Sequence, residues 1–178
     1  MLFMDTSKII QFRLFKNEHK KLPPNSHYNL IYVDSENYLQ YIDELTLITS
    51  YIHKQLTEWT DAPTMEQVHK RFSNNSFCFL FYYNDNCIGW NWANPHVTPD
   101  WINIHTKLKS DEVYLGGCFV TNLVDRPANA GIMNYNMFFD ECLKLGYNPM
   151  YGYCDDWNRI AIRINYSNGW KPYNFIKE

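Results

Sequence analysis

The sequence predicts an α/β protein of the α+β type, in which helices cover both faces of one mixed, mostly antiparallel sheet of about six or seven strands. Three successive runs of strand-forming residues in the middle of the chain favour an antiparallel meander. Segments with helical spacing precede these runs, and a helix–strand–helix–strand alternation follows them. Antiparallel hairpins followed by β-α-β imply a mixed sheet with a helix layer on each side.

The segment 1–26 is expected to form an N-terminal arm. It ends in Lys-Leu-Pro-Pro-Asn-Ser at residues 21–26, which has the composition of a linker. The folded domain is expected to span residues 27–178, a length that can bury a substantial core.

The first elements of this domain are expected to be one strand and two helices. Residues 28–33 are rich in strand formers. Residues 36–57 carry apolar side chains at helical spacing. Thr64 and Gln67 have the spacing of a capping box, which predicts a short second helix to about Phe72.

The middle of the chain has the periodicity of strands. Residues 77–83 and 87–93 flank an Asn-Asp-Asn turn and predict a hairpin. Residues 112–121 predict the third strand of the meander. Gly116 and Gly117 lie inside it, where paired glycines mark a bulge or a close backbone approach more often than ordinary pairing.

The remainder of the chain alternates between helix and strand. The pattern predicts a helix over about 127–145, a strand over 150–154, a helix over about 158–167 and a final short strand from Trp170. Each of the two helices is followed by a glycine, as expected at a helix end.

The composition is that of a globular protein and argues against several functions. The net charge of −3 gives no general attraction to nucleic acid or to anionic membranes. The five cysteines are scattered without a CxxC pair, which argues against a disulfide framework and a structural zinc site. No apolar run is long enough to span a bilayer. We therefore expect a cytoplasmic protein without a metal, and leave open whether it forms a homodimer.

Residues 125–131, Asp-Arg-Pro-Ala-Asn-Ala-Gly, lie between a predicted strand and a predicted helix. Pro127 lacks an N–H group and suits the first helical turn. The free N–H groups of that turn, the positive end of the helix dipole and Arg126 together predict an anion site. The alternative is an ordinary helix start, with Arg126 paired to Asp125 or solvated.

The run from Arg126 to Gly131 resembles the pyrophosphate-binding signature of the GNAT superfamily of N-acetyltransferases, (Q/R)-x-x-G-x-(G/A), with Asn129 in place of the central glycine. Residues 158–170 resemble the last helix of the family, which commonly reads N-x-x-A, then an apolar-Tyr pair, then Gly-Phe. The matching positions there are Asn158, Ala161, Ile164 and Gly169. The two motifs occur in the family's order, and the resemblance covers roughly residues 27–178.

This resemblance implies an acyl-CoA co-substrate, acetyl-CoA or another thioester. The main chain of residues 118–120 is expected to face the pantetheine arm, where Gly116 and Gly117 splay the sheet. The main chain of residues 126–131 is expected to hold the pyrophosphate, and Asn158 to bind the pantetheine. The implied cofactor-binding residues are Cys118, Phe119, Val120, Arg126, Pro127, Ala128, Asn129, Ala130, Gly131 and Asn158.

Two neighbouring residues are candidates for the group that assists the departing thiolate. Many members of the family have a Tyr where this chain has Asn165, one residue before Tyr166. Either Asn165 donates a hydrogen bond or Tyr166 reaches in from the next position. A shift of one residue turns a side chain by about 100° around a helix, so we favour Asn165 as a modest donor.

Three carboxylates are candidates for contact with the amine. Glu112, at the start of the central strand, is the leading candidate for the general base; the alternative is a solvated strand-end carboxylate. Asp155 and Asp156 follow the strand 150–154, at the edge where open α/β sheets bind ligands. We expect Asp155 to contact the acceptor, although both residues equally suit capping of the next helix.

Further candidates lie on the expected acceptor side. His96 and His105 belong to the long connection that is expected to roof the acceptor site, where a His can act as a base. Trp90 and Trp92 share one face of their strand and are expected to line a pocket suited to a sugar, or to pack in the core. Cys118 raises the option of an acyl-cysteine intermediate, but the sequence places no base near it.

The sequence thus predicts an N-acyltransferase that moves an acetyl or short acyl group from acyl-CoA to a primary amine of a small molecule, such as an amino sugar. A protein N-terminus or lysine is the alternative acceptor. A non-catalytic module that keeps a CoA cleft as a sensor or scaffold is a third hypothesis. Neither nucleic acid nor a membrane is expected as a partner.

Overall fold

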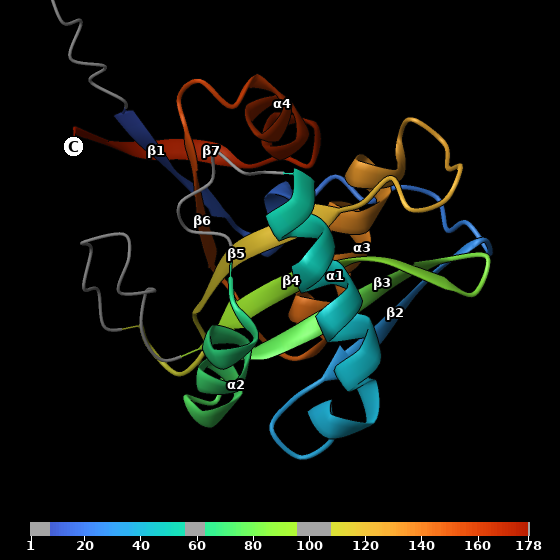
Figure 1. The fold of residues 1–178 in the computed structure, drawn as a ribbon. Coiled ribbons are helices and arrows are strands. Elements are labelled where there is room, and N and C mark those ends of the chain that lie inside the picture. The colour runs from blue at the N-terminus through green and yellow to red at the C-terminus, as the bar shows by residue number, and fades with distance from the viewer. Residues whose placement is uncertain (1–7, 56–62, 96–107, 178) are drawn as a thin grey trace, which may run out of the picture.

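A computed structural model describes residues 8–55, 63–95 and 108–177 (Figure 1). Seven strands form one sheet in the order β2-β3-β4-β5-β6-β1-β7. All neighbouring strands pair antiparallel except β5 and β6, which are parallel. The strands are β1 (Lys8–Leu14), β2 (Tyr28–Val33), β3 (Phe77–Tyr83), β4 (Asn86–Asn94), β5 (Val113–Val120), β6 (Met150–Asp155) and β7 (Lys171–Lys177). The predicted mixed, mostly antiparallel sheet is confirmed.

Two helices cover each face of the sheet, as Figure 1 shows. The helices are α1 (Ile42–Gln55), α2 (Met65–Ser73), α3 (Ala130–Lys144) and α4 (Arg159–Ser167), with short 3₁₀ helices η1 (Lys16–Glu18) and η2 (Tyr38–Tyr41). Side chains alternate along each strand, so one face packs against α1 and α2 and the other against α3 and α4. On β4, for example, Trp90 and Trp92 face α1 and α2, whereas Ala93 belongs to the opposite core.

Local signals positioned these helices well. The predicted capping box is present at α2, where the Gln67 N–H donates to Thr64 Oγ1 and the Thr64 N–H donates to Gln67 Oε1, at 3.2 and 2.8 Å. The helix predicted over 36–57 divides into η2 and α1. None of the helices in the described ranges is long and apolar enough to cross a membrane.

Strand β1 is the main departure from the sequence-based prediction, because it lies inside the segment 1–26 that the sequence suggests is an arm. It pairs with β6 on one side and with β7 on the other. Phe12 and Leu14 are fully buried in the core beside α3. Alternating side chains in Lys-Ile-Ile-Gln-Phe-Arg-Leu carried this strand signal, but charged and polar positions interrupt the apolar run.

The sheet opens between β5 and β6. Their parallel pairing covers only Val113 to Leu115, opposite Met150 to Gly152, and both strands continue beyond it. On its other side, β5 pairs with β4 through a register shift that places Trp90 opposite Phe119 and Trp92 opposite Gly116. Gly117 and Cys118 therefore oppose the single residue Asn91, and the predicted bulge is present.

Gly117 makes this bulge possible. Its φ is +71°, in the left-handed region that side-chain-bearing residues rarely adopt. A Cβ atom at this position would lie 3.2 Å from Nη1 of Arg71 and 3.4 Å from Cδ1 of Trp92. The bulge therefore brings the main chain of β5 directly against side chains of α2 and β4.

Candidate active site

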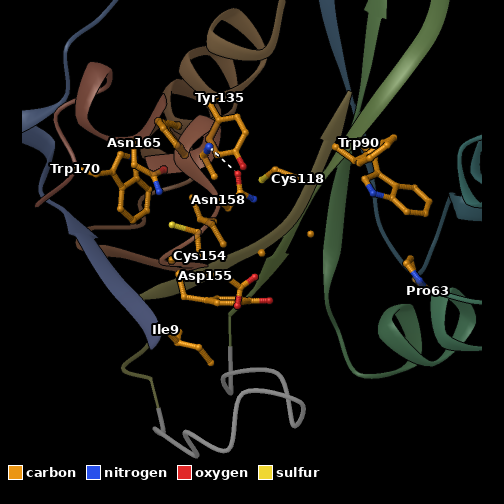
Figure 2. Close-up of a pocket in the computed structure, with 18 of the residues that line it drawn as sticks. Ile9, Pro63, Trp90, Cys118, Tyr135, Cys154, Asp155, Asn158, Asn165 and Trp170 are labelled. Atoms are coloured by element: carbon orange, nitrogen blue, oxygen red, sulfur yellow. Dashed lines mark hydrogen bonds between the residues drawn. The ribbon is translucent and has the colours of Figure 1, made fainter. Parts of the chain in front are cut away.

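A cavity of about 310 Å³ lies where β5 and β6 part. Its walls come from both sides of the sheet, so that the opening between the strands joins a compartment under α3 and α4 to one under α1 and α2. Figure 2 shows Tyr135, Asn158 and Asn165 grouped near Cys118 of β5, with Trp90 and Pro63 on the far side of β5. A passage of this shape can hold two substrates that approach from opposite faces.

The α3–α4 compartment combines apolar walls with amide groups. Its principal lining residues are Cys118, Tyr135, Phe139, Asn158, Ala161 and Asn165. Asn158 is the N-cap of α4, and its Oδ1 accepts a hydrogen bond of 3.0 Å from the Ala161 N–H. This cap leaves the side-chain NH₂ of Asn158 at the cavity wall. Asn158 and Cys118 therefore both line the cavity, and their contact with pantetheine stays a prediction.

The two candidates near the end of α4 separate clearly. Asn165 is buried and lines the cavity, and its carbonyl accepts a hydrogen bond from the Trp170 N–H at 3.0 Å. Tyr166 is half exposed and packs edge-on against Phe12 of β1, with ring centroids 5.8 Å apart. The helical rotation between adjacent residues accounts for this difference. The arrangement favours Asn165 over Tyr166 as the group that meets a ligand.

Cys118 is held as a neutral thiol. Burial raises its pKa to about 12, and its hydrogen bond with the Tyr135 hydroxyl opposes this only in part. The pKa of Tyr135 is raised well above its usual value, also chiefly by burial. A thiol that stays protonated is a poor nucleophile. This electrostatic setting argues against an acyl-cysteine intermediate.

The α1–α2 compartment contains one cation and one carboxylate among its described lining residues, Arg71 and Asp155. Asp155 alternates along β6 with Cys154, whose side chain belongs to the opposite core, so Asp155 projects toward α1 and α2. Trp90 and Phe119 supply apolar walls. Asp155 and Trp90 thus both line this compartment, and their contact with an acceptor stays a prediction.

Trp92 packs in the core instead of lining the cavity. It is fully buried, packs on Phe72 with ring centroids 4.9 Å apart, and is absent from the described cavity lining. The Arg71 guanidinium lies over its ring at 4.9 Å from the centroid. The expectation that both tryptophans line a pocket thus holds for Trp90 but not for Trp92.

Glu112 lies away from the cavity, at the paired end of β5. It is buried, its Oε2 accepts a 2.9 Å hydrogen bond from the Lys109 N–H, and its Oε1 accepts one of 3.2 Å from the Tyr151 hydroxyl. Burial and the Glu112 carboxylate raise the pKa of Tyr151 to about 12. Glu112 is not among the described residues that line the cavity. These contacts indicate a structural role, and a role as the general base stays a prediction.

The loop from Arg126 to Gly131 leads into α3 but does not contribute to the described cavity walls. Arg126 Nε donates to the Thr121 carbonyl at 2.6 Å, and its Nη2 donates to Asn122 Oδ1 at 2.7 Å. The guanidinium therefore shapes its own loop. Gly131 lies close to α4, because a Cβ there would be 3.5 Å from Cδ1 of Ile164.

The remaining residues of this loop keep the main chain accessible. Pro127, Ala128 and Asn129 are exposed, Asn129 is the N-cap without a side-chain cap, and Ala130 is buried. The N–H groups in the first turn of a helix have no acceptor within that helix. The predicted anion site at this turn therefore stays a prediction, as does the contact of Val120 main chain with pantetheine.

Two wall residues could not be identified as such from the sequence. Tyr135 lies four residues after Gly131, on the same face of α3. Arg71 lies near the end of a short helix whose charged residues read as a solvated face. His96 and His105 lie outside the described residues.

No protein-family model matches the sequence. No curated protein matches it either. Solved structures do match. A GCN5-related N-acetyltransferase from Kribbella flavida superposes with a TM-score of 0.57 at 10% identity, over 96% of this chain and 56% of that one.

Two further matches are proteins of amino-sugar chemistry. An aminoglycoside acetyltransferase from an uncultured soil metagenomic sample, in complex with trehalose, superposes with a TM-score of 0.55 at 11% identity, over 81% of this chain and 88% of that chain. The glucosamine N-acetyltransferase region of a fungal multi-domain β-N-acetylglucosaminidase superposes with a TM-score of 0.60 at 10% identity, over 96% of this chain and 20% of that one.

This chain spans 50% of the length of a matching Drosophila protein and 56% of the Kribbella enzyme, so it corresponds to a part of several of these structures. At sequence identities of 10 to 12%, these matches establish a shared fold but not a shared activity. The seven-stranded mixed sheet, its opening between β5 and β6 and these superpositions lead to one conclusion: the chain has the GNAT fold of the GCN5-related N-acetyltransferases.

Proposed function

We propose that this protein is an N-acyltransferase that moves an acetyl or short acyl group from an acyl-CoA to a primary amine of a small molecule. The observation that carries this proposal is the cavity that passes between β5 and β6 and opens under both helix layers. Two substrates that enter from opposite faces can meet at the bulge of β5. Direct transfer between two bound molecules requires this arrangement.

The acyl-CoA belongs on the α3–α4 side. The main chain of β5 beyond Leu115 has no partner strand on its β6 side, so its peptide groups can pair with the amides of a pantetheine arm. Asn158 offers an NH₂ group to the same arm. The first turn of α3, which follows the Arg126 loop, supplies amide donors for the diphosphate.

The reaction forms one bond and breaks another. The amine nitrogen attacks the thioester carbonyl carbon, the N–C bond forms, the C–S bond breaks, and a proton lost by nitrogen is balanced by one gained by sulfur. Asp155, a carboxylate of the cavity wall, receives the first proton in this proposal, directly or through water. Asn165 and the neutral Tyr135 phenol, which also line the cavity, donate hydrogen bonds to the departing sulfur.

Amino sugars are the first acceptor class to test. Trp90 and Phe119 provide the flat apolar walls that sugar rings pack against. Two of the structural matches, the aminoglycoside acetyltransferase and the glucosamine N-acetyltransferase region, are named for amino-sugar acceptors. These names support the choice of substrate panel.

Thermal unfolding with acetyl-CoA tests the first half of the proposal. A ligand at about 100 times its Kd adds ~2.7 kcal/mol to the folded state, which raises the Tm by roughly 5–10 °C for a chain of this size. Ala161→Trp, which fills the α3–α4 compartment, should abolish this rise. Ile160→Trp is the matched control, because Ile160 is on the same helix but 75% exposed.

Thiol release from acetyl-CoA, measured with a panel of amines, tests the second half. Release that depends on an amine, with formation of the amide confirmed by mass spectrometry, supports the proposal. Stabilisation by acetyl-CoA without release from any amine would instead favour the non-catalytic sensor. Absence of both responses would refute any CoA-dependent role.

A further inference from the structure

Arg71 is an arginine in an unusual place. It projects from α2 into the α1–α2 compartment of the cavity, and its guanidinium stacks over the Trp92 ring at 4.9 Å from the centroid. Nη1 lies 3.2 Å from the position that a Cβ on Gly117 would take, so the edge of the guanidinium reaches the bulge of β5. Arg71 therefore lies in the cavity wall between Trp92 of β4 and Gly117 of β5.

This cation has no carboxylate partner within the part of the chain that the structure describes. Burial lowers its pKa, whereas the nearby Tyr153 and Cys78 only partly offset that effect. Arginine nevertheless stays charged in proteins. Arg71 is partly shielded from water, and an anionic ligand in the cavity would offset this loss of hydration, so the position of the cation favours a ligand of opposite charge.

The stacked geometry specifies how such a ligand is held. Trp92 covers one face of the guanidinium, which leaves its in-plane N–H donors for the cavity. Planar two-oxygen groups, carboxylates and phosphate esters, match these donors with paired hydrogen bonds. Because the guanidinium lies at the bulge, the anion bound to it lies close to the junction of the two compartments.

We propose that the acceptor is a primary amine that carries an anionic group, a carboxylate or a phosphate ester, and that Arg71 binds this group. This inference rests on the proposed acyltransferase function and specifies its substrate class. Asp155 lies in the same compartment. The compartment thus presents a positive and a negative side chain to a molecule that has both an ammonium and an anion.

Kinetics with matched acceptor pairs test the inference. The pairs are glycine and glycinamide, O-phosphoethanolamine and ethanolamine, and glucosamine 6-phosphate and glucosamine; the first distinguishes a carboxylate from the phosphates of the other two. At saturating acetyl-CoA, the charged member of at least one pair should have a kcat/KM about 10-fold or more above its neutral partner, mainly through KM. Equal or lower values for the charged members of all three pairs would overturn the inference.

Arg71→Met should lower kcat/KM for the charged acceptor by about 10- to 100-fold and change the neutral one by less than about threefold. The ratio is measured within one variant, so a loss of folded enzyme affects both members equally. Arg71→Lys should recover part of the ratio. Arg13→Met is the matched control, because Arg13 also lies over aromatic rings, those of Phe15 and Tyr173, but outside the described cavity lining.

Two other outcomes have definite meanings. An equal fall for charged and neutral acceptors would assign Arg71 to the thioester or to the fold and overturn the inference while the acyltransferase stands. If no amine is acylated, the proposed function fails by itself, and calorimetry with CoA and each charged and neutral amine decides the inference. Charged amines that bind no more tightly than neutral ones, or equally well to Arg71→Met, would refute it.

Discussion

The two ends of strand β5 differ in every respect that matters for the site. At its beginning, Tyr114 and Leu115 pair with β4 on one side and with β6 on the other, and Glu112 accepts two hydrogen bonds. At its other end, the strand bulges at Gly117, keeps only β4 as a neighbour and lines a cavity. The first end supplies stability to the sheet, and the second supplies the main chain that a ligand can reach.

This difference teaches that a carboxylate on the central strand need not lie at the site where a ligand binds. Position along the strand decides, because residues 115–119 of β5 line the cavity and Glu112 is not among its described lining residues. The predictions below test whether the two ends can be disturbed separately.

Gly89→Ala should have the largest effect, because it attacks the β4–β5 pairing at the open end. An added Cβ would lie 2.2 Å from the Phe119 carbonyl oxygen, which is backbone and cannot turn away. We expect a loss of about 3 kcal/mol in the free energy of unfolding, measured with urea, and weaker acetyl-CoA binding.

Gly116→Ala is the control for this change. Its Cβ would lie 3.5 Å from Cε1 of Tyr114, an ordinary contact. Its stability should stay within about 1 kcal/mol of the natural sequence. A Gly89→Ala protein that is equally stable would show that β4 and β5 are not held closely here.

Asp155→Asn and Glu112→Gln compare a carboxylate that lines the cavity with one at the paired end of β5. Asp155→Asn should lower kcat/KM by about 100-fold, because general-base catalysis contributes on this scale. Glu112→Gln should lower stability by about 1 kcal/mol and leave kcat/KM within about threefold, because an amide oxygen still accepts from the Lys109 N–H. Steady-state kinetics and urea unfolding check both, and the reverse pattern would return the base to Glu112.

Asn91 of β4 lies opposite the bulge, and a substitution there tests whether its hydrogen bonds to α3 stabilise this part of the sheet. Its Nδ2 donates to Asn134 Oδ1 at 2.6 Å, and Asn134 Nδ2 donates back at 2.9 Å, in a fully buried pair between β4 and α3. Asn91→Leu should cost about 2 kcal/mol, because it leaves the Asn134 amide unsatisfied. The double variant with Asn134→Leu should recover part of this loss in urea unfolding, and strict additivity would contradict the pairing.

Cys118→Ala should have the smallest effect and leave kcat within about twofold, because the thiol is neutral and not a nucleophile. With a pKa of about 12, Cys118 should react with iodoacetamide far more slowly at pH 8 than a free thiol, and faster as pH rises. Peptide mass spectrometry measures this. Rapid alkylation at pH 8, or a trapped acyl group on Cys118, would contradict the expected direct transfer.

The raised pKa of Cys118 also makes the stability of the folded protein depend on pH. The folded protein holds the thiol proton more tightly than an unfolded chain, whose thiol has a pKa near 9.0. The stabilisation is therefore complete below pH 9 and is lost as pH rises toward 12. Urea unfolding across this range should show less decline for Cys118→Ala than for the natural sequence.

The sequence predicted most elements of the fold because their signals are local. Alternation and turn residues located β2 to β4, and the Thr64 capping box located α2. The paired glycines predicted the bulge from backbone freedom alone. Strand β1 was missed because its partner strands, β6 and β7, lie at the other end of the chain, and no local pattern reports a partner so far away.

The site was predictable where backbone rules determine it and not where packing does. Helical rotation predicted that Asn165 and Tyr166 point in different directions, and only Asn165 is among the described cavity-lining residues. The position of Asn158 follows from its role as the N-cap of α4. The sequence alone does not show the surroundings of Arg71 or of Glu112. A charged residue on a helix reads as solvated until tertiary contacts enclose it, and a carboxylate on a central strand reads as catalytic until its hydrogen bonds are known.

The position of β1 also determines when the site can come into existence. Ile9 pairs with Asp155, and Lys8 pairs with Lys177. Strand β1 leaves the ribosome first but cannot pair until β6 and β7 have been synthesised. Contacts of such long sequence separation form slowly. Ile9 and Asp155 both border the cavity. During synthesis the meander can assemble first, whereas a nascent chain that lacks β6 and β7 has no cavity wall on that side.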